Sequence, residues 1–433
     1  MSLALYRLAT VLGAPLVGLW LSRRRAAGKE EAARQGERTG RADRARPPGE
    51  LIWLHAASVG ESVSALPLIE RLLNTRPDTH VLVTTVTVTS ARIMAERLPK
   101  RAFHQYAPVD TPGAVRRFLD YWAPDRAIWI ESELWPNMIA MSRARGVPLA
   151  LVNARLSSRS HHRWRRAPRL ISGVLGAFDL VLAQSADAAA RLRELGARDA
   201  ETVGNLKHDA PPLAADPAAL ASLTAALGNR RLWLAASTHE GEEAAAAAAH
   251  RHLAARHSDL LTVIAPRHPP RGAEIVRALR AAGFRLAQRS AGEAVGPDTE
   301  IYLADTLGEL GLLYRLSPIV FVGGSLIPHG GQNPLEPARL GCAVLHGPHM
   351  ENFHEAAARL HEADGAIELA RASMLGDALG DLLDDDARRA RLADRAGRVT
   401  VELGGALDRV WQRLEPFLSN TSARPAEDAH AHA

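Results

Sequence analysis

The sequence predicts an α/β fold with two doubly wound, Rossmann-like units. Apolar, β-rich runs alternate with helical segments from Leu51 onward, and these runs occur in two separate series. Continuous apolar strands separated by helices are typical of parallel sheets that are buried on both faces. A chain of 433 residues is also too long for one compact core, because cores usually stop growing at about 250–300 residues.

The apolar runs give the positions of the expected strands. Ligands of doubly wound folds bind beyond the carboxyl ends of the strands, so we expect two units that face each other across a cleft containing the active site. The strands are expected at residues 51–58, 80–87, 102–108, 126–132, 148–154 and 180–185 in the first series, and at 231–238, 261–267, 284–290, 300–306, 319–325 and 343–348 in the second.

Composition divides the chain into segments. With 47% hydrophobic and 23% charged residues, the chain is globular and has ample material for its cores. The expected segments are a membrane anchor (1–22), a charged connector (23–50), a first Rossmann-like unit (51–207), a linker rich in alanine and proline that runs into a helix (208–230), a second Rossmann-like unit (231–418) and a disordered tail (419–433).

Residues 1–22 form an apolar stretch that carries one charge, Arg7, and is followed by a basic flank. A segment of roughly 20 residues can span a bilayer, and basic residues after it favour a cytoplasmic location for the rest of the chain. Because the charge follows the apolar run, an uncleaved anchor fits better than a cleavable signal peptide. A short amphipathic surface helix is the alternative, because Arg7, Gly13 and Pro15 weaken a spanning helix.

Several classes of site are not supported by the sequence. Cys342 is the single cysteine, which excludes an intramolecular disulfide and any cysteine-based metal cluster, and its apolar neighbours predict a buried, inert thiol. The sequence has no GxxxxGK[ST] motif of a P-loop NTPase. It also has no HExxH motif and no obvious DxD pair before a small apolar strand, so no metal site is supported. The net charge of +5 is modest, and nucleic acid is therefore a poor partner.

Glu61 is the strongest single candidate for a catalytic residue. It follows the turn at Val59 and Gly60 and opens a helix whose apolar residues recur at helical spacing over 62–74. A helix N-terminus stabilises a carboxylate, so Glu61 should be ionised at neutral pH and could accept a proton. The competing interpretation is an ordinary capping residue in a first helical turn.

Further polar residues follow other expected strands. The serine and threonine that open the second unit's first helix suit contacts with an anion, and an arginine is suited to bidentate oxyanion binding. Glycines after a strand permit close backbone approach, and Glu336 could bond ribose hydroxyls. These residues are Glu131 and Glu133, Lys207, Ser237 and Thr238, Arg267 and His268, Gly323 and Gly324, and Asn333–Glu336.

Residues 155–169 contain six arginines, two histidines and a tryptophan but no acidic residue. A solvated face is one interpretation of such a run. Beside a membrane anchor, cations interleaved with an aromatic ring are more typical of a surface that meets anionic headgroups or the phosphates of an acceptor.

Together these motifs resemble those of the Kdo transferases (3-deoxy-D-manno-octulosonic acid transferases) of Gram-negative bacteria. The resemblance runs from the N-terminal segment to about residue 418. One departure is Gln332, at a position where many relatives have histidine. The motifs are HAASVGE, ESELWPN, NARLSSRS, GNLKHD, STHEGEE, PRH, VGGSLIPHGGQNPLEPA and GPHMENF.

The resemblance implies a glycosyltransferase of GT-B architecture at the cell inner membrane, with its catalytic domains facing the cytoplasm. Its first unit would bind the acceptor, a lipid A precursor (lipid IVA) in lipopolysaccharide core biosynthesis, and its second unit would bind the donor CMP-Kdo. No cofactor is implied. Glu61 would be the general base, Glu131 and Lys207 would assist the transition state, and CMP would be held by Arg267, His268, Gly308, Glu309, Leu310, Asn333, Pro334, Leu335 and Glu336.

This chemistry agrees with the residue types. Displacing CMP from an anomeric carbon requires a base for the acceptor hydroxyl and cations for the departing phosphate, and two cations make a metal unnecessary. Two other functions stay open at this point: a GT-B enzyme that uses another nucleotide sugar, and a noncatalytic, membrane-attached nucleotide-binding protein.

Overall fold

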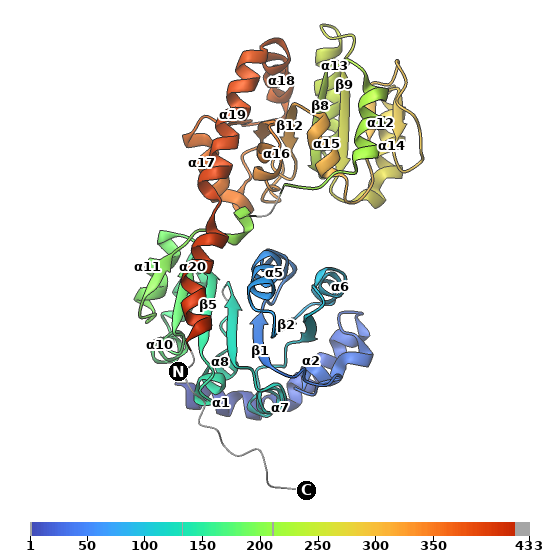
Figure 1. The fold of residues 1–433 in the computed structure, drawn as a ribbon. Helices are drawn as coiled ribbons and strands as arrows, with labels where there is room; N and C mark the ends of the chain where they lie inside the picture. Colours follow the sequence, from blue (N-terminus) through green and yellow to red (C-terminus); the bar gives the residue numbers. More distant parts are fainter. Residues whose placement is uncertain (1, 132, 210–211, 421–433) are drawn as a thin grey trace. The chain divides into compact units, whose positions relative to one another are not determined.

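The computed structural model describes residues 2–131, 133–209 and 212–420. The chain forms two compact units (Figure 1). Unit 1 comprises Met1–Ala210 together with Gly404–Ala433, and unit 2 comprises Pro211–Leu403.

Unit 1 is built on a parallel sheet, which has seven strands within the described residues. Strand β1 lies near its middle and pairs with β2 on one side and β4 on the other. The strand order is β3 (Ala102–Tyr106), β2 (Thr79–Thr85), β1 (Glu50–His55), β4 (Arg126–Ile130), β5 (Leu149–Ala154), β6 (Leu180–Ala183) and β7 (Ala200–Thr202).

Helices cover both faces of this sheet. The helices of unit 1 are α1 (Leu3–Leu12), α2 (Ala14–Ala26), α3 (Gln35–Arg38), α4 (Val59–Ser64), α5 (Leu66–Thr75), α6 (Val88–Arg97), α7 (Pro112–Trp122), α8 (Pro136–Ala144), α9 (Ser158–Trp164), α10 (Pro168–Leu175), α11 (Ala186–Glu194) and α20 (Ala406–Ser419), with 3-10 turns η1 (Ala32–Arg34) and η2 (Leu206–Asp209). Alternate residues of β1 enter different cores: Leu51 and Trp53 pack with α7, α8 and α10, whereas Ile52 and Leu54 pack with α5 and α20. This burial on both faces explains why the strands are continuously apolar.

Unit 2 repeats the same plan. Its sheet is parallel and, within the described residues, also has seven strands. The order is β10 (Leu286–Gln288), β11 (Ile301–Leu303), β9 (Leu261–Pro266), β8 (Leu232–Thr238), β12 (Ile319–Val322), β13 (Ala343–His346) and β14 (Ala366–Glu368).

The unit 2 sheet is likewise enclosed by two helical layers. They consist of α12 (Pro217–Leu227), α13 (Glu242–Ala254), α14 (Gly272–Ala281), α15 (Leu310–Leu316), α16 (Leu335–Arg339), α17 (His354–Glu362), α18 (Leu375–Asp384) and α19 (Asp386–Leu403), with 3-10 turns η3 (Pro269–Arg271), η4 (Glu351–Phe353) and η5 (Ala372–Met374). Leu232 and Leu234 face α12, α15, α16 and α19, and Trp233 faces α13, α14 and α18.

The predicted α/β class and both parallel sheets are confirmed. All twelve expected strands are present, and the sequence analysis missed β7 and β14, which are edge strands of three residues each. Cys342 is buried as predicted, and burial raises the pKa of its thiol to about 12. That the two units face each other stays a prediction.

The predicted boundary of the second unit at residue 418 is wrong. After α19 the chain returns to unit 1, where α20 contributes Val410, Trp411 and Leu414 to the core on one face of the sheet. The Arg126 guanidinium fixes the end of α20 by donating hydrogen bonds to the carbonyls of Phe417 (3.1 Å) and Asn420 (2.7 Å). Of the expected disordered tail, residues 421–433 lie outside the described residues.

The N-terminal segment forms two helices rather than one. Within the described residues, no single helix is long and apolar enough to cross a membrane, although α1 and α2 together pass that test with a bend of 59°. Helix α1 packs against α7, α8 and α10 of unit 1, and Tyr6 donates a 2.9 Å hydrogen bond to Asp110. A membrane-spanning helix at the N-terminus is therefore not confirmed.

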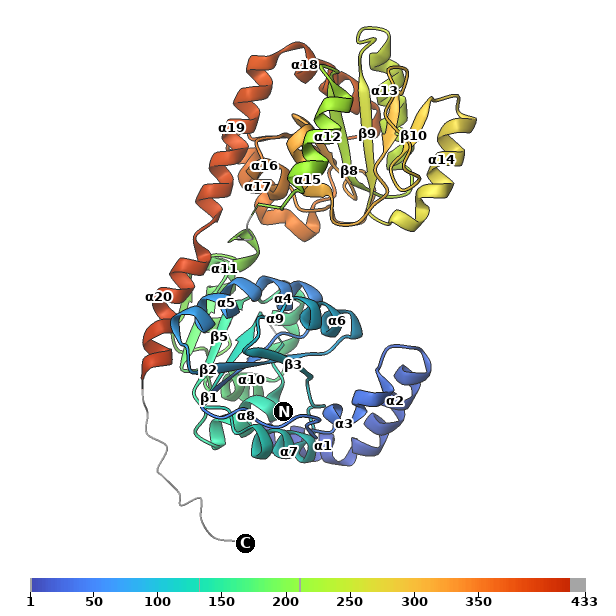
Figure 2. The same ribbon diagram turned by 45° about the vertical axis from the view of Figure 1, so that its right-hand side comes forward.

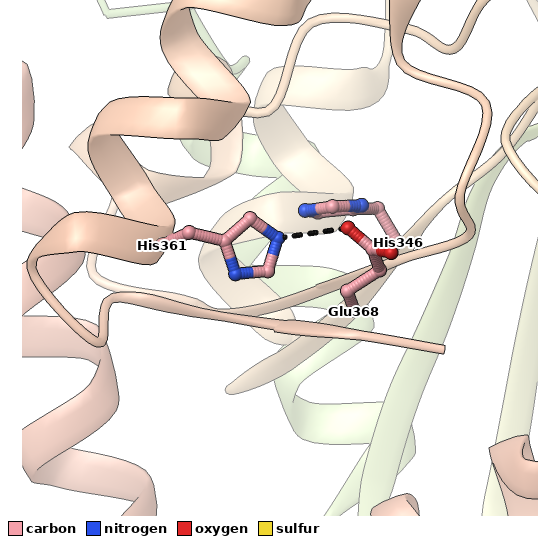
Figure 3. A group of neighbouring side chains, drawn as sticks. All are labelled: His346, His361 and Glu368. Atoms are coloured by element: carbon pink, nitrogen blue, oxygen red, sulfur yellow. Dashed lines mark ion pairs between the residues drawn. The ribbon is translucent and has the colours of Figure 1, made fainter. Parts of the chain in front are cut away.

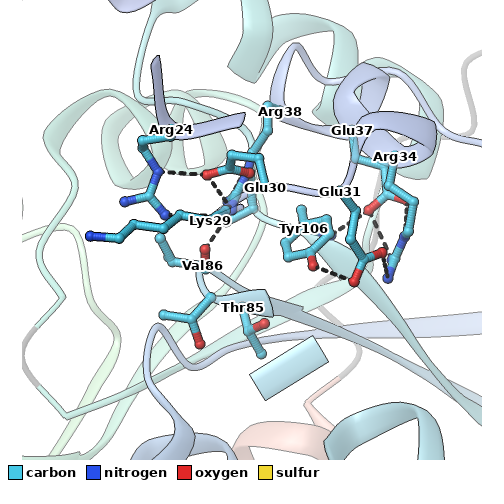
Figure 4. A network of polar contacts seen from close by, with 12 residues as sticks. Arg24, Lys29, Glu30, Glu31, Arg34, Glu37, Arg38, Thr85, Val86 and Tyr106 are labelled. Atoms are coloured by element: carbon cyan, nitrogen blue, oxygen red, sulfur yellow. Dashed lines mark hydrogen bonds and ion pairs between the residues drawn. The ribbon is translucent and has the colours of Figure 1, made fainter. Parts of the chain in front are cut away.

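The expected polar connector, residues 23–50, is folded against unit 1. Figure 4 shows its ion pairs: Glu30 binds both Arg24 (2.7 Å) and Arg38 (2.9 Å). Glu37 is buried, binds Arg34 (2.7 Å) and accepts the backbone N–H of Tyr106 (2.5 Å). Helix α3 packs against β3, and both are labelled in Figure 2. The charged connector thus packs against unit 1, because its paired charges satisfy one another in a partly buried network.

Candidate functional site

Glu61 lies in the first turn of α4, where Ser58 is the N-cap residue and accepts the Glu61 backbone N–H (3.3 Å). The Glu61 carboxylate reaches back and accepts the backbone N–H of Ala57 through Oε2 (2.7 Å). Glu61 is thus a capping residue, as the competing interpretation proposed. Its side chain is also buried and lies near Glu131, which is an environment that suits a general base.

Glu61 was expected to be ionised at neutral pH, but its carboxyl has a raised pKa. Burial and the nearby charge of Glu131 raise the pKa of the Glu61 carboxyl to about 7, although the hydrogen bonds from Ala57 and Ser58 act in the opposite direction. Desolvation disfavours the charged form and outweighs the stabilising effect of the helix terminus. The Glu61 carboxyl therefore titrates near neutral pH, which is the range that favours general-base catalysis.

Glu131 and Lys207 form a close ion pair in unit 1. The Lys207 Nζ lies 2.5 Å from the Glu131 Oε1, and Glu131 is buried at the end of β4. A Cβ atom added to Gly60 would lie 3.9 Å from Nζ, so the ammonium also lies beside the start of α4. The structure therefore brings Glu61, Glu131 and Lys207 together, and we call these three residues the acidic cluster.

Asn153 positions Lys207 and was not identified from the sequence. It lies at the end of β5 with a φ of 54°, is fully buried, and accepts the backbone N–H of Leu206 through Oδ1 (3.0 Å). Asn205 in turn accepts the Lys207 backbone N–H (3.1 Å). A non-glycine residue with positive φ in a buried strand end was a signal that only the structure could supply.

Glu133 does not join this ion pair. Its carboxylate accepts the indole N–H of Trp135 (2.7 Å), and the Trp135 ring lies 5.5 Å from the ring of His55. Burial lowers the pKa of His55 to about 3, so His55 is a neutral imidazole. Among the described residues of the HAASVGE motif, Glu61 is therefore the side chain that titrates near neutral pH. Ser132 lies outside the described residues.

In unit 2, three histidines and one arginine lie in the loops that follow β8, β9 and β12. The His239 ring lies 3.9 Å from that of His329 and 5.6 Å from that of His268. Burial, and then the neighbouring His329, His268 and Arg267, lower the pKa of His239 to about 4. We call His239, His268, His329 and Arg267 the histidine cluster. An environment that disfavours a further positive charge favours a bound anion.

Gln332, which departs from the family pattern, contacts this cluster. Its Nε2 lies 3.4 Å from the Nε2 of His239. Because an amide N–H donates, the His239 nitrogen accepts and the imidazole stays neutral, in agreement with its lowered pKa. The glutamine thus contacts His239 without an ionisable ring of its own.

Glu242 organises the loop after β12 and was not selected from the sequence. Its carboxylate accepts the backbone N–H groups of Gly324 (2.7 Å), Ser325 (3.0 Å) and Leu326 (3.0 Å), as well as that of His239 (2.9 Å). That Gly324 lies close to a ligand stays a prediction. Its N–H group binds Glu242, so the Glu242 carboxylate of the STHEGEE motif holds this loop from within the protein.

Gly323 approaches protein backbone instead of a ligand. A Cβ atom at this position would lie 2.5 Å from the carbonyl oxygen of Ser237, which itself has a φ of 56°. Thr238 is fully buried and its hydroxyl donates to Glu243 (3.0 Å). Ser237 and Thr238 thus shape the strand end, and the Thr238 hydroxyl proton is already used within the protein.

The Asn333–Glu336 segment opens α16. Asn333 accepts the backbone N–H of Leu335 (3.1 Å) and donates to Glu336 Oε1 (3.2 Å), while Leu335 is buried. Burial raises the pKa of Glu336. Pro334 precedes the helix as its N-cap residue. The Glu336 carboxyl is thus held in place by Asn333 and could bond a ribose hydroxyl.

The segment 308–310 lies at the start of α15. Gly308 has a φ of 82°, and Leu310 is the first helical residue. The Glu309 carboxylate is engaged by Arg289 through both oxygens and also accepts the Thr306 hydroxyl. The hydrogen bonds from Arg289 are the largest cause that lowers the pKa of Glu309. A ligand contact from this segment would therefore come most readily from its backbone.

The arginine-rich stretch 155–169 acquires an acidic neighbour from another helix. Glu194 of α11 lies 2.9 Å from His161 and 3.4 Å from Arg165. Among the described ion pairs, Glu194 is the carboxylate that faces this stretch of six arginines. Residues 155–169 therefore keep a net positive charge. Their function as a contact for anionic groups stays a prediction.

The arrangement of these clusters defines a class of protein. Two parallel α/β units carry polar groups at their strand ends, with a carboxyl that titrates near pH 7 in one unit and an arginine beside three histidines in the other. This is the organisation of a GT-B glycosyltransferase.

Comparison with known proteins identifies the family. Residues 33–210 match the family described as 3-Deoxy-D-manno-octulosonic-acid transferase (kdotransferase). The 3-deoxy-D-manno-octulosonic acid transferase of Bordetella pertussis is 38% identical over 433 residues, which covers 96% of this chain and 100% of the relative. This chain belongs to the 3-deoxy-D-manno-octulosonic acid transferase family, and it is a glycosyltransferase.

Solved structures confirm the fold. A glycosyltransferase from Rickettsia africae is 12% identical, with a TM-score of 0.57 and coverage of 86% of this chain and 100% of that one. UDP-GlcNAc 2-epimerase from Neisseria meningitidis is 14% identical, with a TM-score of 0.58 and coverage of 84% and 100%. Since a transferase and an epimerase share this fold, the fold alone does not determine the reaction.

We predict that Glu131→Gln lowers the pKa of Glu61 but leaves it above the ordinary value of 4.5, because burial remains the larger cause. The substitution removes a nearby negative charge and frees the Lys207 ammonium. NMR titration of ¹³C-labelled glutamate carboxyl groups measures this shift directly.

Glu133→Gln is the matched control, because Glu133 is the last of the causes that raise the Glu61 pKa. Its effect on the titration of Glu61 should be smaller than that of Glu131→Gln. Equal shifts in the two variants, or none in either, would contradict the assigned geometry.

Proposed function

We propose that this protein transfers Kdo from CMP-Kdo to a lipid A precursor, lipid IVA, in lipopolysaccharide core biosynthesis. Family membership supports Kdo transfer as the reaction class. The observation that carries the mechanism is the Glu61 carboxyl, with a pKa of about 7, beside the Glu131–Lys207 ion pair. The reaction would be inverting and independent of a metal.

In this proposal the Glu61 carboxylate accepts the proton of the acceptor hydroxyl as its oxygen attacks the anomeric carbon of Kdo. The bond from that carbon to the CMP phosphate breaks, and CMP leaves with the bonding electron pair. Attack on the face opposite the leaving group inverts the anomeric centre. Lys207 would neutralise charge on the phosphate or on the Kdo carboxylate, and Glu131 would hold the ammonium in place.

Donor binding is assigned to unit 2. Arg267 and His268 are exposed after β9, where a guanidinium can make charge-assisted bonds to the CMP phosphate. The Glu336 carboxyl, positioned by Asn333, would bond the ribose. Gly308–Leu310 would contribute backbone contacts. An enzyme with another nucleotide-sugar donor would bind it through the same elements, but it would need a different segment to recognise the nucleobase.

We also propose that the protein is attached to the cytoplasmic face of the inner membrane of a Gram-negative cell. Helices α1 and α2 present exposed apolar side chains, among them Leu12 (71% exposed) and Leu16 (70% exposed). Since α1 is packed on unit 1 and bends away from α2, a segment that lies on the membrane fits these contacts better than one that spans it. The cations of residues 155–169 would add attraction to anionic headgroups.

Glu61→Gln should reduce transfer by about 10²–10⁴-fold, the usual contribution of a general base, while CMP affinity stays nearly unchanged. In the wild type, kcat/KM should rise with pH through about 7, because the carboxylate and not the acid accepts the proton. Glu70→Gln, at an exposed position on α5, is the matched control. Wild-type turnover by Glu61→Gln would exclude this residue as the base.

Arg267→Ala should weaken CMP binding by about tenfold to a hundredfold, since a charge-assisted hydrogen bond contributes roughly 1.5–3 kcal/mol. Calorimetric titration with CMP measures the change. Arg277→Ala removes an exposed arginine of α14 in the same unit and should leave the dissociation constant unchanged. If both variants bind CMP as the wild type does, Arg267 does not contact the phosphate.

Replacing Leu12 and Leu16 together by aspartate should release much of the protein from membranes, because both side chains are largely exposed and their substitution leaves the core intact. The released protein should keep a weak association that disappears at high salt. Val401→Asp, at a position 79% exposed on α19, is the control. Undiminished sedimentation of the double variant with membranes at high salt would contradict the assignment.

A further inference from the structure

Three potential metal ligands converge at the carboxyl end of the unit 2 sheet. Among the described residues, His346, His361 and Glu368 form the group of histidine, cysteine or acidic side chains whose ligand atoms all lie within 4.8 Å of one another. His346 ends β13, Glu368 ends the neighbouring β14 and is its register partner, and His361 lies in the last turn of α17. Figure 3 shows the three side chains pointing toward one another.

A hydrogen bond to the backbone fixes the tautomer of His346. Its Nδ1 lies 2.8 Å from the carbonyl oxygen of Gly347, and a carbonyl only accepts, so Nδ1 carries the proton. The lone pair is therefore on Nε2, which is buried and has no hydrogen-bond partner in the described structure. A backbone carbonyl that fixes the tautomer of a histidine is the usual outer contact of a metal-ligating imidazole.

His361 and Glu368 lie at a separation that suits two ligands of one metal ion. The Nε2 of His361 and the Oε2 of Glu368 are 3.1 Å apart, close to the ~3.3 Å that separates two ligand atoms on one tetrahedral zinc with bonds of about 2.0 Å. Both side chains are partly exposed, at 37% and 47%, so they can adjust and an ion can enter. The carboxyl end of α17 also favours a cation.

We propose that His346, His361 and Glu368 bind a divalent transition-metal ion such as Zn²⁺. Two imidazoles and one carboxylate are ligands that zinc accepts, and the partly exposed side leaves a fourth position for water. The ion has no part in the proposed transfer step.

A bound ion would stiffen a segment that contacts the loop after β12. Directly after His346, the Gly347 N–H donates to the Ser325 hydroxyl (2.8 Å), and the N–H of His349 donates to the Ser325 carbonyl (3.0 Å). Linking β13 to α17 and β14 would therefore restrain residues 347–353. The site acts as a structural clamp on this part of unit 2.

The test is titration of the metal-free full-length chain with Zn²⁺, followed by calorimetry, with Co²⁺ absorption as a probe of tetrahedral coordination. His430 and His432 are replaced by asparagine in every sample, because tail histidines could bind metal weakly. We expect one equivalent of Zn²⁺ to bind, a raised Tm, and slower amide exchange in residues 343–353.

Glu368→Gln and His361→Asn should each weaken Zn²⁺ binding by at least about tenfold, since even outer contacts of a metal site contribute that much. Both positions are partly exposed, so the variants should fold, which their unchanged metal-free Tm would verify. His252→Asn is the matched control: His252 forms a similar 3.1 Å pair with Asp377, for which the described residues offer no third ligand. Absence of binding in the parent, or equal binding in the parent and Glu368→Gln, would overturn the proposal.

Discussion

Both units depend on one constraint: a parallel sheet covered by helices on both faces leaves little room for charged side chains except where its strands begin or end. In unit 1, the strand β1 has its alternate residues in two separate apolar cores, and the same holds for β8 in unit 2. The carboxyl ends of the strands therefore hold the chemistry. Glu131, Asn153, the histidine cluster and His346 all lie at or just after such ends.

Burial at these ends determines what each carboxylate can do. Glu242 accepts four backbone N–H groups and thereby holds the loop after β12 in place. Glu61 accepts one backbone N–H through its carboxylate. Its burial, and then the charge of Glu131, raise the pKa of its carboxyl to about 7. Two glutamates in the first turns of helices thus have different surroundings.

Local patterns were sufficient to predict the two sheets, the helix after Glu61 and the candidate residues of the acidic cluster. Features that depend on contacts distant in sequence were not predictable. The return of α20 to unit 1 and the packing of α1 beside Asp110 arise from tertiary burial. The ionisation of Glu61 depends on Glu131, and the placement of Lys207 depends on Asn153. A positive φ at Asn153 leaves no trace in sequence periodicity.

The central claim is that the chain moves Kdo from CMP-Kdo to a lipid A precursor. The most direct test is mass spectrometry of the lipid after incubation of the purified protein with CMP-Kdo and a tetraacylated lipid A precursor, with parallel incubations that contain UDP-sugars instead. The account predicts a lipid whose mass has increased by one or more Kdo residues, with release of CMP, and no product from UDP-sugars. An unmodified lipid in the presence of CMP-Kdo, or transfer from a UDP-sugar, would contradict it.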